Sequence, residues 1–530
     1  MSGPGQALLL AGGDVVIDDR GLERADVLVR DGRIAAVGGD LPATDARVID
    51  CAGAIVMPGF IDMHSHADDA VFDDEVQRAL LRQGVTTVVT GQDGVSYAPG
   101  DGRYGGDYFG GLLGSARHYD GGGVGSLLRA YDGATRVNVA YLVPLGTVRH
   151  DVMGDDAAAP TPEQLARMRE IVARALAEGA VGVSTGLDYV PGLFAGTAEL
   201  AALAEVAARA GGVYVTHMRG GYEDNVSVGI DEAIRIGQLS GARVHISHLH
   251  ADAPRVASEM ERMRAAGVEA TFDAYPYRRG CTLLGMLALP PELVALGLEE
   301  AARRLGDEEL VEQLLTDWFP QVARRADLGP AWLERVTYSH VPSPAHRELE
   351  GLSLDEAGRA RGTDPLRLLC RVLSDTRLHT VVIARNPRVR TDDELSAIFT
   401  SKYHTAGSDG IYQGGSPHPR GWGTFARFLS TFTRDRGDYS WSQAATHLSR
   451  RGAEVLGLSG RGRVAAGATA DLAVVDPTRV RDRATYTHPA RVATGVDVVV
   501  VDGRVVLDGG ELTGELAGQG IRNTHQGAGA

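Results

Sequence analysis

The sequence predicts an α/β protein, a TIM-like (β/α)8 barrel with a small β-sandwich domain formed by both termini. The first observation is that eight apolar runs rich in β-branched residues alternate with helical segments between residues 59 and 440. Near-continuous apolar strands that alternate with helices are typical of a parallel sheet covered by helices. The second is that short strand-like runs, broken by Asp-Gly and Gly-Gly turns, occupy both ends of the chain, as they do in hairpins.

The two β-rich ends are expected to pair with each other. Residues 6–57 contain "LLLAGGDVVIDD" and "ADVLVRDGRIAAVGG", and the same texture returns near the C-terminus in "VDVVVVDGRVVLDGG". We expect residues 1–58 and 441–515 to form the β-sandwich domain and residues 59–440 to form the barrel. Residues 516–530, which include "AGQGIRNTHQGAGA", are expected to be a flexible tail.

The barrel strands are predicted at "FIDMHSH", "VTTVVTG", "VNVAYLVP", "VGVSTG", "VYVTHM", "RVHISH", "VEATFDAY" and "HTAGSD". Helical segments lie between several of them. The segment 161–180 begins with Thr161 as a cap and Pro162 in the first turn, which are both typical of a helix start. Residues from about 283 to 350 indicate a helical insertion after the seventh strand, on the barrel face where insertions act as lids.

The composition is that of a globular protein that does not bind nucleic acid. The chain has 530 residues, a hydrophobic fraction of 44%, a charged fraction of 23% and a net charge of −16, whereas phosphate binding needs clustered basic residues. No run approaches the roughly 20 apolar residues of a membrane span, and the N-terminus lacks the basic region of a secretory signal. Three distant cysteines (Cys51, Cys281 and Cys370) predict a reducing compartment. We expect a cytoplasmic protein without a membrane partner, and the sequence leaves open whether it forms a homo-oligomer.

Five of the eight predicted strands end in residues that can bind a metal or move a proton. These residues are His64 and His66 at the first strand, Asp93 after the second, His217 at the fifth, His248 at the sixth and Asp409 at the eighth. Catalytic groups of such barrels collect at the carboxyl ends of the strands, and His and Asp are zinc ligands. Alone, Asp93 would be interpreted as a turn residue beside Gly94. Together with the other strand ends, it is predicted to be a metal ligand.

Several motifs give the chain a family resemblance. "PGFIDMHSHAD", "STGLDYVPG", "THMR", "ISHLH", "DAYPY" and "GSDG…HPRGWGTF" resemble the N-acyl-D-amino-acid deacylases (D-aminoacylases) of the amidohydrolase superfamily, over nearly the whole chain. The resemblance implies zinc-dependent hydrolysis of the amide that joins an acyl group to a D-amino acid. It also implies a tight zinc site at Asp93, His217 and His248, a second and weaker site at His64 and His66, and Asp409 as the general acid/base. The residues themselves suggest the same mechanism, in which metal activates water and Asp409 moves the proton.

Asp93 is the main departure from the family pattern. The family's usual motif there is "NCG", with cysteine as the ligand, and this chain has "QDG". Carboxylate is a harder ligand than thiolate, so one or two zinc ions are expected, with Mn, Co or Fe as alternatives. Relatives elsewhere in the superfamily bridge two metals with a carboxylated lysine on strand four. The only lysine of this chain is Lys402, which leaves Asp93 as the best candidate for a bridging carboxylate.

Substrate recognition requires a group that binds the free carboxylate of an N-acyl amino acid. The resemblance points to Tyr275, Arg420 and Tyr189 of "STGLDYVPG", and to His250 where the family commonly has a lysine. A histidine there removes a fixed positive charge, which Arg278, Arg279 or Lys402 could replace; the alternative is that both arginines are simply solvated. We expect His245 to face the outer helices, because its spacing from His248 puts it out of phase, and Cys281 to be a small filler residue. The third strand reads "VPLGTVR" where family members often carry a histidine.

Two other functions are kept open. One is the same chemistry on a D-dipeptide, a cyclic amide or an N-acyl intermediate of a natural product. The other is a non-catalytic homologue, against which the retained four histidines and two aspartates weigh.

Overall fold

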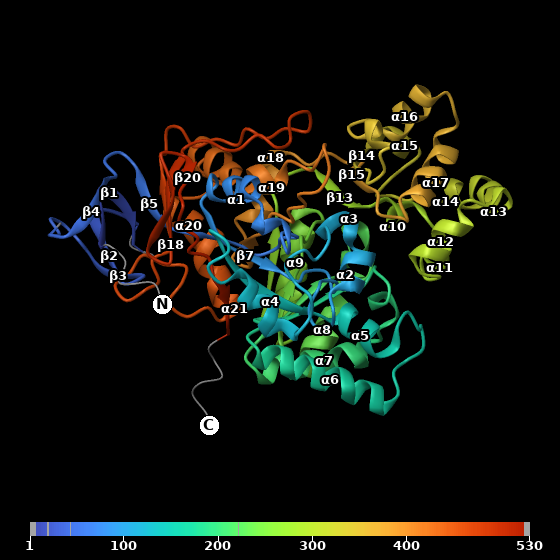
Figure 1. The fold of residues 1–530 in the computed structure, drawn as a ribbon, viewed down its shortest axis with the longest axis horizontal. Helices are drawn as coiled ribbons and strands as arrows, with labels where there is room; N and C mark the ends of the chain where they lie inside the picture. The colour runs from blue at the N-terminus through green and yellow to red at the C-terminus, as the bar shows by residue number, and fades with distance from the viewer. Residues whose placement is uncertain (1–6, 18–20, 43, 221, 524–530) are drawn as a thin grey trace.

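The eight predicted barrel strands are confirmed. The structure, a computed structural model, describes residues 7–17, 21–42, 44–220 and 222–523, and its central sheet is shown in Figure 1. The strands are β6 (Phe60–Asp62), β7 (Val85–Thr90), β8 (Asn138–Pro144), β9 (Gly182–Gly186), β10 (Val213–His217), β11 (Arg243–Ile246), β12 (Ala270–Ala274) and β16 (His404–Ala406). They are parallel and lie in the order β16-β12-β11-β10-β9-β8-β7-β6. The backbone N–H of Met63 donates to the carbonyl of Ala406 at 3.1 Å, and Ser65 bridges to Gly410, so the sheet closes on itself.

Amphipathic helices cover the outside of the barrel. They are α1 (Asp74–Leu81), α4 (Gly123–Tyr131), α6 (Pro162–Ala177), α7 (Thr197–Arg209), α8 (Val226–Ser240), α9 (Ala253–Ala265) and α18 (Asp392–Phe399). Shorter helices at the rim are α2 (Arg103–Tyr108), α3 (Gly110–Leu113), α5 (Leu145–Met153) and α19 (Arg420–Arg427), which continues as a π-helix over Phe428–Asp435. The start of α6 is as predicted, since Thr161 caps it by accepting from the N–H of Gln164.

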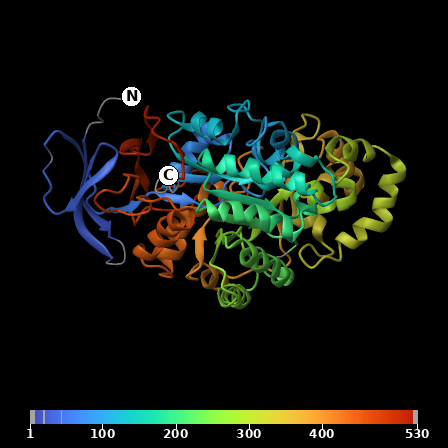
Figure 2. The ribbon, with the colours of Figure 1, turned by 90° about the horizontal axis from the view of Figure 1, so that it is seen from below.

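Both termini contribute to one β domain, as expected. Its strands are β1 (Ala7–Val16), β2 (Leu22–Arg30), β3 (Arg33–Gly38), β4 (Ala46–Asp50), β5 (Ile55–Pro58), β17 (Leu472–Val475), β18 (Val496–Val501), β19 (Arg504–Asp508) and β20 (Glu511–Leu512). The two ends of the chain meet where β5 pairs antiparallel with β17. The domain has a core of its own, in which Val27, Val56 and Leu472 are fully buried. Figure 2 shows this domain beside the barrel, at the opposite end of the molecule from the insertion.

Two C-terminal stretches lie elsewhere than the sequence predicts. Residues 441–456, expected in the β domain, form α20 (Trp441–Ala445), a π-helix (Thr446–Arg450) and α21 (Arg451–Leu456). These helices belong to the barrel, because Ser449 Oγ donates to the carbonyl of Gly59 at 2.6 Å and Arg451 donates to that of His404. The expected flexible tail is ordered over residues 516–523, where β21 (Gly520–Ile521) pairs parallel with β8; residues 524–530 lie outside the described part.

The insertion after the seventh strand is larger than expected and is not purely helical. It contains a three-stranded antiparallel sheet in the order β13-β15-β14, formed by β13 (Arg279–Leu283), β14 (Val336–His340) and β15 (Val381–Arg385). Its helices are α10 (Leu284–Ala288), α11 (Pro291–Val294), α12 (Leu298–Arg304), α13 (Glu308–Gln313), α14 (Phe319–Val322), α15 (Trp332–Arg335), α16 (Leu354–Arg361) and α17 (Pro365–Asp375). This lobe is drawn in yellow in Figure 1 and lies beside the rim of the barrel.

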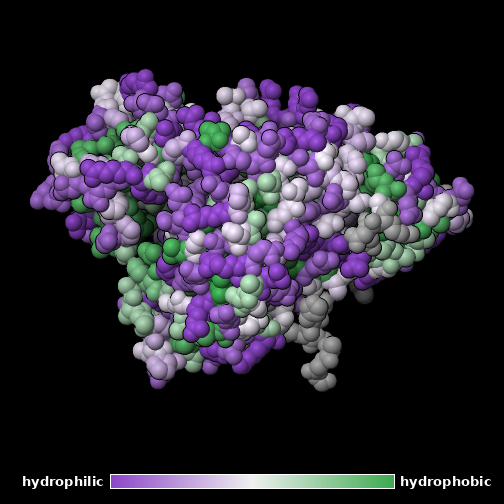
Figure 3. Space-filling model, turned by 180° about the vertical axis from the view of Figure 1, so that it is seen from behind, coloured by the Kyte–Doolittle hydropathy of each residue, from purple (hydrophilic) through white to green (hydrophobic). Residues whose placement is uncertain are grey.

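The surface is predominantly polar on the face that Figure 3 shows, with hydrophobic side chains scattered singly or in small groups. Within the described ranges, no helix has the length and apolarity that a membrane crossing requires.

Candidate metal centre

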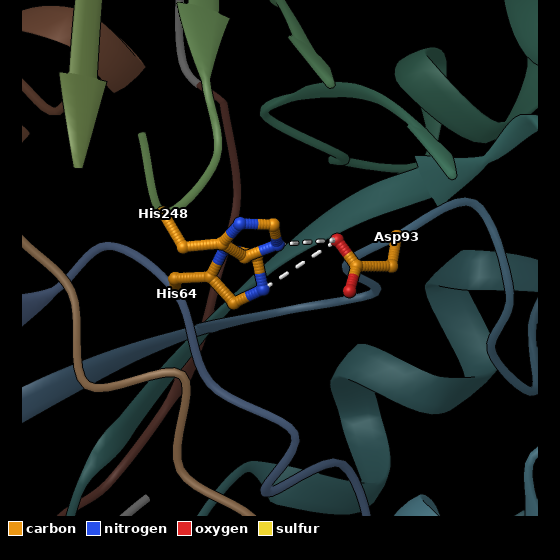
Figure 4. A group of neighbouring side chains, drawn as sticks. All are labelled: His64, Asp93 and His248. Atoms are coloured by element: carbon orange, nitrogen blue, oxygen red, sulfur yellow. Dashed lines mark ion pairs between the residues drawn. The ribbon is translucent and has the colours of Figure 1, made fainter. Parts of the chain in front are cut away.

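The six residues predicted at the strand ends lie together at the carboxyl end of the barrel. His64 and His66 follow β6, Asp93 follows β7, and His217 is the last residue of β10; His248 follows β11, and Asp409 follows β16. Figure 4 shows the side chains of His64 and His248 directed toward the carboxylate of Asp93. All six side chains are buried or nearly so.

Asp93 is the centre of this group. Its Oδ1 lies 3.6 Å from His64 Nε2 and 3.8 Å from His248 Nε2. Its Oδ2 lies 3.6 Å from His66 Nε2 and 3.9 Å from His217 Nδ1. Each carboxylate oxygen therefore faces two imidazoles, which is the arrangement expected of a carboxylate that could serve two metal ions.

Asp409 faces the same group with one oxygen only. Its Oδ1 lies 3.3 Å from His66 Nε2 and 3.8 Å from His64 Nε2. Its other oxygen, Oδ2, lies 2.9 Å from Nη2 of Arg420, a fully buried arginine. Asp409 is therefore tethered to Arg420 through one oxygen, while its other oxygen faces two imidazoles.

Three of these residues have a left-handed backbone. The φ angles are +54° at Asp93, +36° at His248 and +50° at Asp409. Aspartate tolerates this region, whereas a histidine there is uncommon and costs energy that the surroundings must offset. Asp93 is thus both a turn residue and a site residue, and beside it Gly94 is irreplaceable because a Cβ would lie 2.6 Å from the backbone N of Gly186.

The charges of the group are strongly coupled. Burial alone would raise the pKa of Asp93, but the imidazoles of His64, His248 and His217 hold it well below its usual range. Burial opposes the charged form of His64, yet Asp93 and Asp273 together raise its pKa to about 10. At His248 burial prevails and lowers the pKa. The cluster therefore has an ionised carboxylate surrounded by imidazoles that compete for positive charge.

The donor set fits a transition-metal ion. Two sets of three residues, His64–Asp93–His248 and His64–His66–Asp409, each bring their ligand atoms within 4.8 Å of one another. Buried His64 Nε2 and Asp93 Oδ1 have no hydrogen-bond partner among the described residues, although buried polar atoms are normally paired. A cation would satisfy them, and imidazole with carboxylate is a combination that zinc binds.

Two carboxylates that were not predicted lie behind the histidines. Asp188 Oδ2 lies 3.2 Å from His217 Nε2, and Asp273, at the end of β12, contacts His64 and His245. Both occur in the quoted motifs "STGLDYVPG" and "DAYPY", so a search for acidic residues at the strand ends would have found them.

The expectation that His245 faces the outer helices is wrong. His245 is fully buried inside the barrel, where its Nε2 donates to Asp273 at 3.1 Å. The alternation rule failed because β11 ends at Ile246. His248 then lies in a left-handed turn rather than on the strand. The direction of its side chain therefore does not indicate which residues of β11 face the barrel interior.

Comparisons with known proteins identify the family of the chain. A model of the amidohydrolase family matches residues 47–289 and 325–507. The chain belongs to the amidohydrolase family. This amidohydrolase is 32% identical over 514 residues to the N-acyl-D-glutamate deacylase of Alcaligenes xylosoxydans xylosoxydans, covering 94% of this chain and 93% of the relative. It is 32% identical over 539 residues to the D-aminoacylase of the same organism, covering 98% of each chain.

A similar solved structure is that of an N-acyl-D-glutamate deacylase from Bordetella bronchiseptica, in complex with zinc and a phosphonate that mimics the tetrahedral intermediate. It superimposes on this amidohydrolase with a TM-score of 0.81 at 31% identity, and the match covers 98% of this chain and 99% of the other. The resemblance indicated by the motifs is therefore confirmed.

The residues predicted to bind substrate divide into two sets in this amidohydrolase. Arg420 and Tyr275 lie beside the metal residues, with the guanidinium 4.7 Å from the centre of the Tyr275 ring. Tyr189 places its hydroxyl 3.3 Å from His217 Nδ1. His250 lies at the rim, where its ring stacks on Tyr222 at 4.7 Å and its Nδ1 lies 2.7 Å from the carbonyl of His248.

The basic residues considered as replacements for the family lysine are engaged elsewhere. Arg278 donates to the carbonyl of Arg390 and to Asp392 Oδ1 at 2.6 Å, so it ties the residue before β13 to the start of α18. Arg279 lies over the ring of Tyr486 at 3.8 Å. Lys402 pairs with Glu261 of α9 at 3.0 Å, on the outer surface of the barrel. Arg420 remains as the buried cation of the site.

A cleft of about 1200 Å³ lies between the barrel rim and the insertion. Its walls include Tyr104, Tyr108, His150, Val190, Leu298 and Arg377, and none of the metal residues lines it. Val190 of the cleft wall directly follows Tyr189, whose hydroxyl lies 3.3 Å from His217 Nδ1.

Proposed function

We propose that this amidohydrolase hydrolyses the amide bond of N-acyl-D-amino acids and releases the free D-amino acid. The observation that carries the proposal is that Asp93 faces four imidazoles. Two of these imidazoles also face Asp409, which is tethered to buried Arg420. The similar proteins include an N-acyl-D-glutamate deacylase and a D-aminoacylase, which supports the proposal.

Asp93, His217 and His248 would hold one metal ion, and His64 and His66 would hold a second one next to Asp93. A divalent ion bound there supplies a water of lowered pKa and an electrophile for the amide carbonyl. We propose zinc as the ion, in one or two copies. Because carboxylate replaces the softer thiolate at Asp93, binding of Mn, Co or Fe is expected to be more competitive than at a cysteine site.

Asp409 is suited to move the proton. Burial raises its pKa, but the guanidinium of Arg420 and the neighbouring imidazoles outweigh this and hold the pKa at about 2, so the carboxylate is ionised at neutral pH. Asp409 accepts a proton from water as the water oxygen bonds to the carbonyl carbon. It then returns that proton to the amide nitrogen as the carbon–nitrogen bond breaks, which leaves a carboxylic acid and an amine.

Arg420 is suited to bind the carboxylate of the substrate. Its Nε and Nη1 are buried and have no hydrogen-bond partner in the described part of the chain, and a carboxylate would satisfy such donors. Tyr275 packs against the guanidinium and keeps it in place. The free carboxylate of an acyclic substrate would pair with these donors of Arg420, whereas a cyclic amide would leave them unpaired.

A panel of N-acetyl-D- and N-acetyl-L-amino acids tests the proposal on zinc-reconstituted protein. We expect turnover of D-substrates, with an Asp409→Asn variant as the control that binds metal without turnover. Exclusive activity on L-substrates, or no activity on any member, would reject the proposed function. The unpaired cysteines also fit the cytoplasmic location that we propose.

A further inference from the structure

One carboxylate outside the group of six candidate metal residues touches two of the strand ends that carry that group. Asp273, the fourth residue of β12, has no exposed surface. Its Oδ1 accepts a hydrogen bond from the backbone N–H of His248 at 2.9 Å. Its Oδ2 accepts from His245 Nε2 at 3.1 Å and lies 3.5 Å from His64 Nδ1. Asp273 therefore connects β6, β11 and β12 directly below the metal residues.

The second neighbour of Asp273 is the ring of His64, whose Nδ1 lies 3.5 Å from Asp273 Oδ2. A carboxylate next to Nδ1 favours the tautomer with the proton on Nδ1, which leaves the lone pair on Nε2. Nε2 is the atom that points to Asp93 at 3.6 Å. Without Asp273, the ring of His64 could rotate or take the other tautomer, and its lone pair would no longer be fixed toward the site.

The contact with His248 holds an unfavourable backbone. His248 has φ at +36°, a region that residues with a Cβ rarely adopt. Asp273 binds this turn twice, because its side chain accepts from the N–H of His248 and its backbone carbonyl accepts from the N–H of Leu249 at 2.8 Å. These bonds offset the strain and fix the direction in which the His248 side chain leaves the backbone.

The surroundings of Asp273 are shaped to keep it in this position. A Cβ at Gly407, next to β16, would lie 2.7 Å from Asp273 Oδ1 and 2.9 Å from the Cβ of His64, so only glycine leaves room for the contact. On the other side His245 anchors the carboxylate and is itself held by Thr271, whose Oγ1 lies 2.7 Å from His245 Nδ1. Gly407, His245 and half-buried Thr271 thus support one carboxylate that does not face the metal position itself.

We propose that Asp273 is a positioning residue that orients His64 and His248 and thereby sets the metal affinity of the centre, with His245 as its anchor and Gly407 as the space it requires. The inference rests on the proposed metal centre. It goes beyond the proposed metal centre by assigning to the hydrogen-bonded chain Thr271–His245–Asp273 a role in metal binding rather than in packing alone.

The test measures zinc affinity of the folded protein by competition with a chromogenic chelator. Outer carboxylates behind metal-binding histidines contribute about 10- to 100-fold in affinity, so we expect Asp273→Asn to bind zinc weaker by that factor. We also expect the visible absorption spectrum of the cobalt-substituted variant to change, because the geometry around the ion changes. Gly407→Ala displaces the same carboxylate without removing its charge, and should weaken zinc in the same direction even if Asp273→Asn does not fold.

The matched control is Asp471→Asn. Asp471 is also a buried carboxylate, and it binds Arg461, Asn138 and the backbone of Asp502, away from the metal residues. The Asp471→Asn substitution should lower the thermal stability of the protein and leave its zinc affinity unchanged. Zinc affinity and a cobalt spectrum equal to wild type in both Asp273→Asn and Gly407→Ala would overturn the assignment of Asp273. A wild-type protein that binds no divalent metal would instead overturn the proposed function.

Discussion

Replacement of Asp93 by asparagine removes one charge from the centre of four imidazoles and leaves the side-chain shape almost unchanged. The Asp93 oxygens lie 3.6 to 3.9 Å from the four nitrogens. A cation held among these nitrogens would lie within about 4 Å of the carboxylate. At that distance and an effective dielectric constant of about 20, one pair of unit charges contributes about 4 kcal/mol, which is about a thousandfold in a dissociation constant. Asp93→Asn should therefore bind zinc about a thousandfold more weakly than wild type.

Two further variants at the same position separate charge from ligand type. Asp93→Cys keeps an anionic ligand and should retain zinc while it loses Mn relative to wild type, because thiolate is the softer ligand. Asp93→Ala should lose zinc at least as completely as Asp93→Asn. Chelator competition gives the affinities, and metal analysis after dialysis gives the bound equivalents. An Asp93→Asn protein that keeps zinc with wild-type affinity would refute the reasoning.

Three other predictions follow from the site. Asp409→Asn should keep its metal and lose turnover by about 10²- to 10⁴-fold, and a variant with wild-type kcat would remove Asp409 from the mechanism. The pKa of His64 is raised to about 10, so we expect both ring nitrogens of His64 to be protonated at neutral pH in the metal-free protein. Zinc binding at pH 8 should release one of these protons, and zinc affinity should rise with pH up to about 10. Calorimetry in two buffers measures this proton release. Proton-neutral binding would contradict this. Arg420→Leu should raise KM for N-acyl-D-amino acids and raise the pKa of Asp409, so that the acidic limb of the kcat profile moves to higher pH; an unchanged KM would show that the substrate carboxylate binds elsewhere.

The barrel could be predicted because its strands are short, apolar and separated by helices with clear start signals. "VTTVVT" and "VNVAYLVP" match the buried β7 and β8, and the Thr161 cap marks α6 as expected. The strands of the insertion were missed because β14 and β15 pair antiparallel in a separate small sheet, a partner choice that local patterns do not contain. Residues 520–521 were expected to be flexible, since Gly and polar residues gave no sign that the strand β8 would hold them.

That the six candidate metal residues lie together could be predicted because strand ends converge in a barrel, whichever contacts they make. Their orientation could not be predicted in the same way. The strand phase placed His245 outside, but β11 ends before His248, and both histidines are held from the inside by Asp273. Arg278 looked available in the sequence, yet Asp392, 114 residues away, binds it. Such long-range pairs depend on the fold and not on spacing.

A crystal structure of the zinc-loaded protein, with an anomalous difference map collected at the zinc edge, tests the metal centre most directly. We predict a peak at about 2.0–2.2 Å from an oxygen of Asp93 and the ring nitrogens of His217 and His248, with Asp409 on the side of the peak that faces Arg420. A zinc peak at these histidines with the Asp93 side chain turned away, or no peak at this end of the barrel, would contradict the assignment of Asp93 as the central ligand.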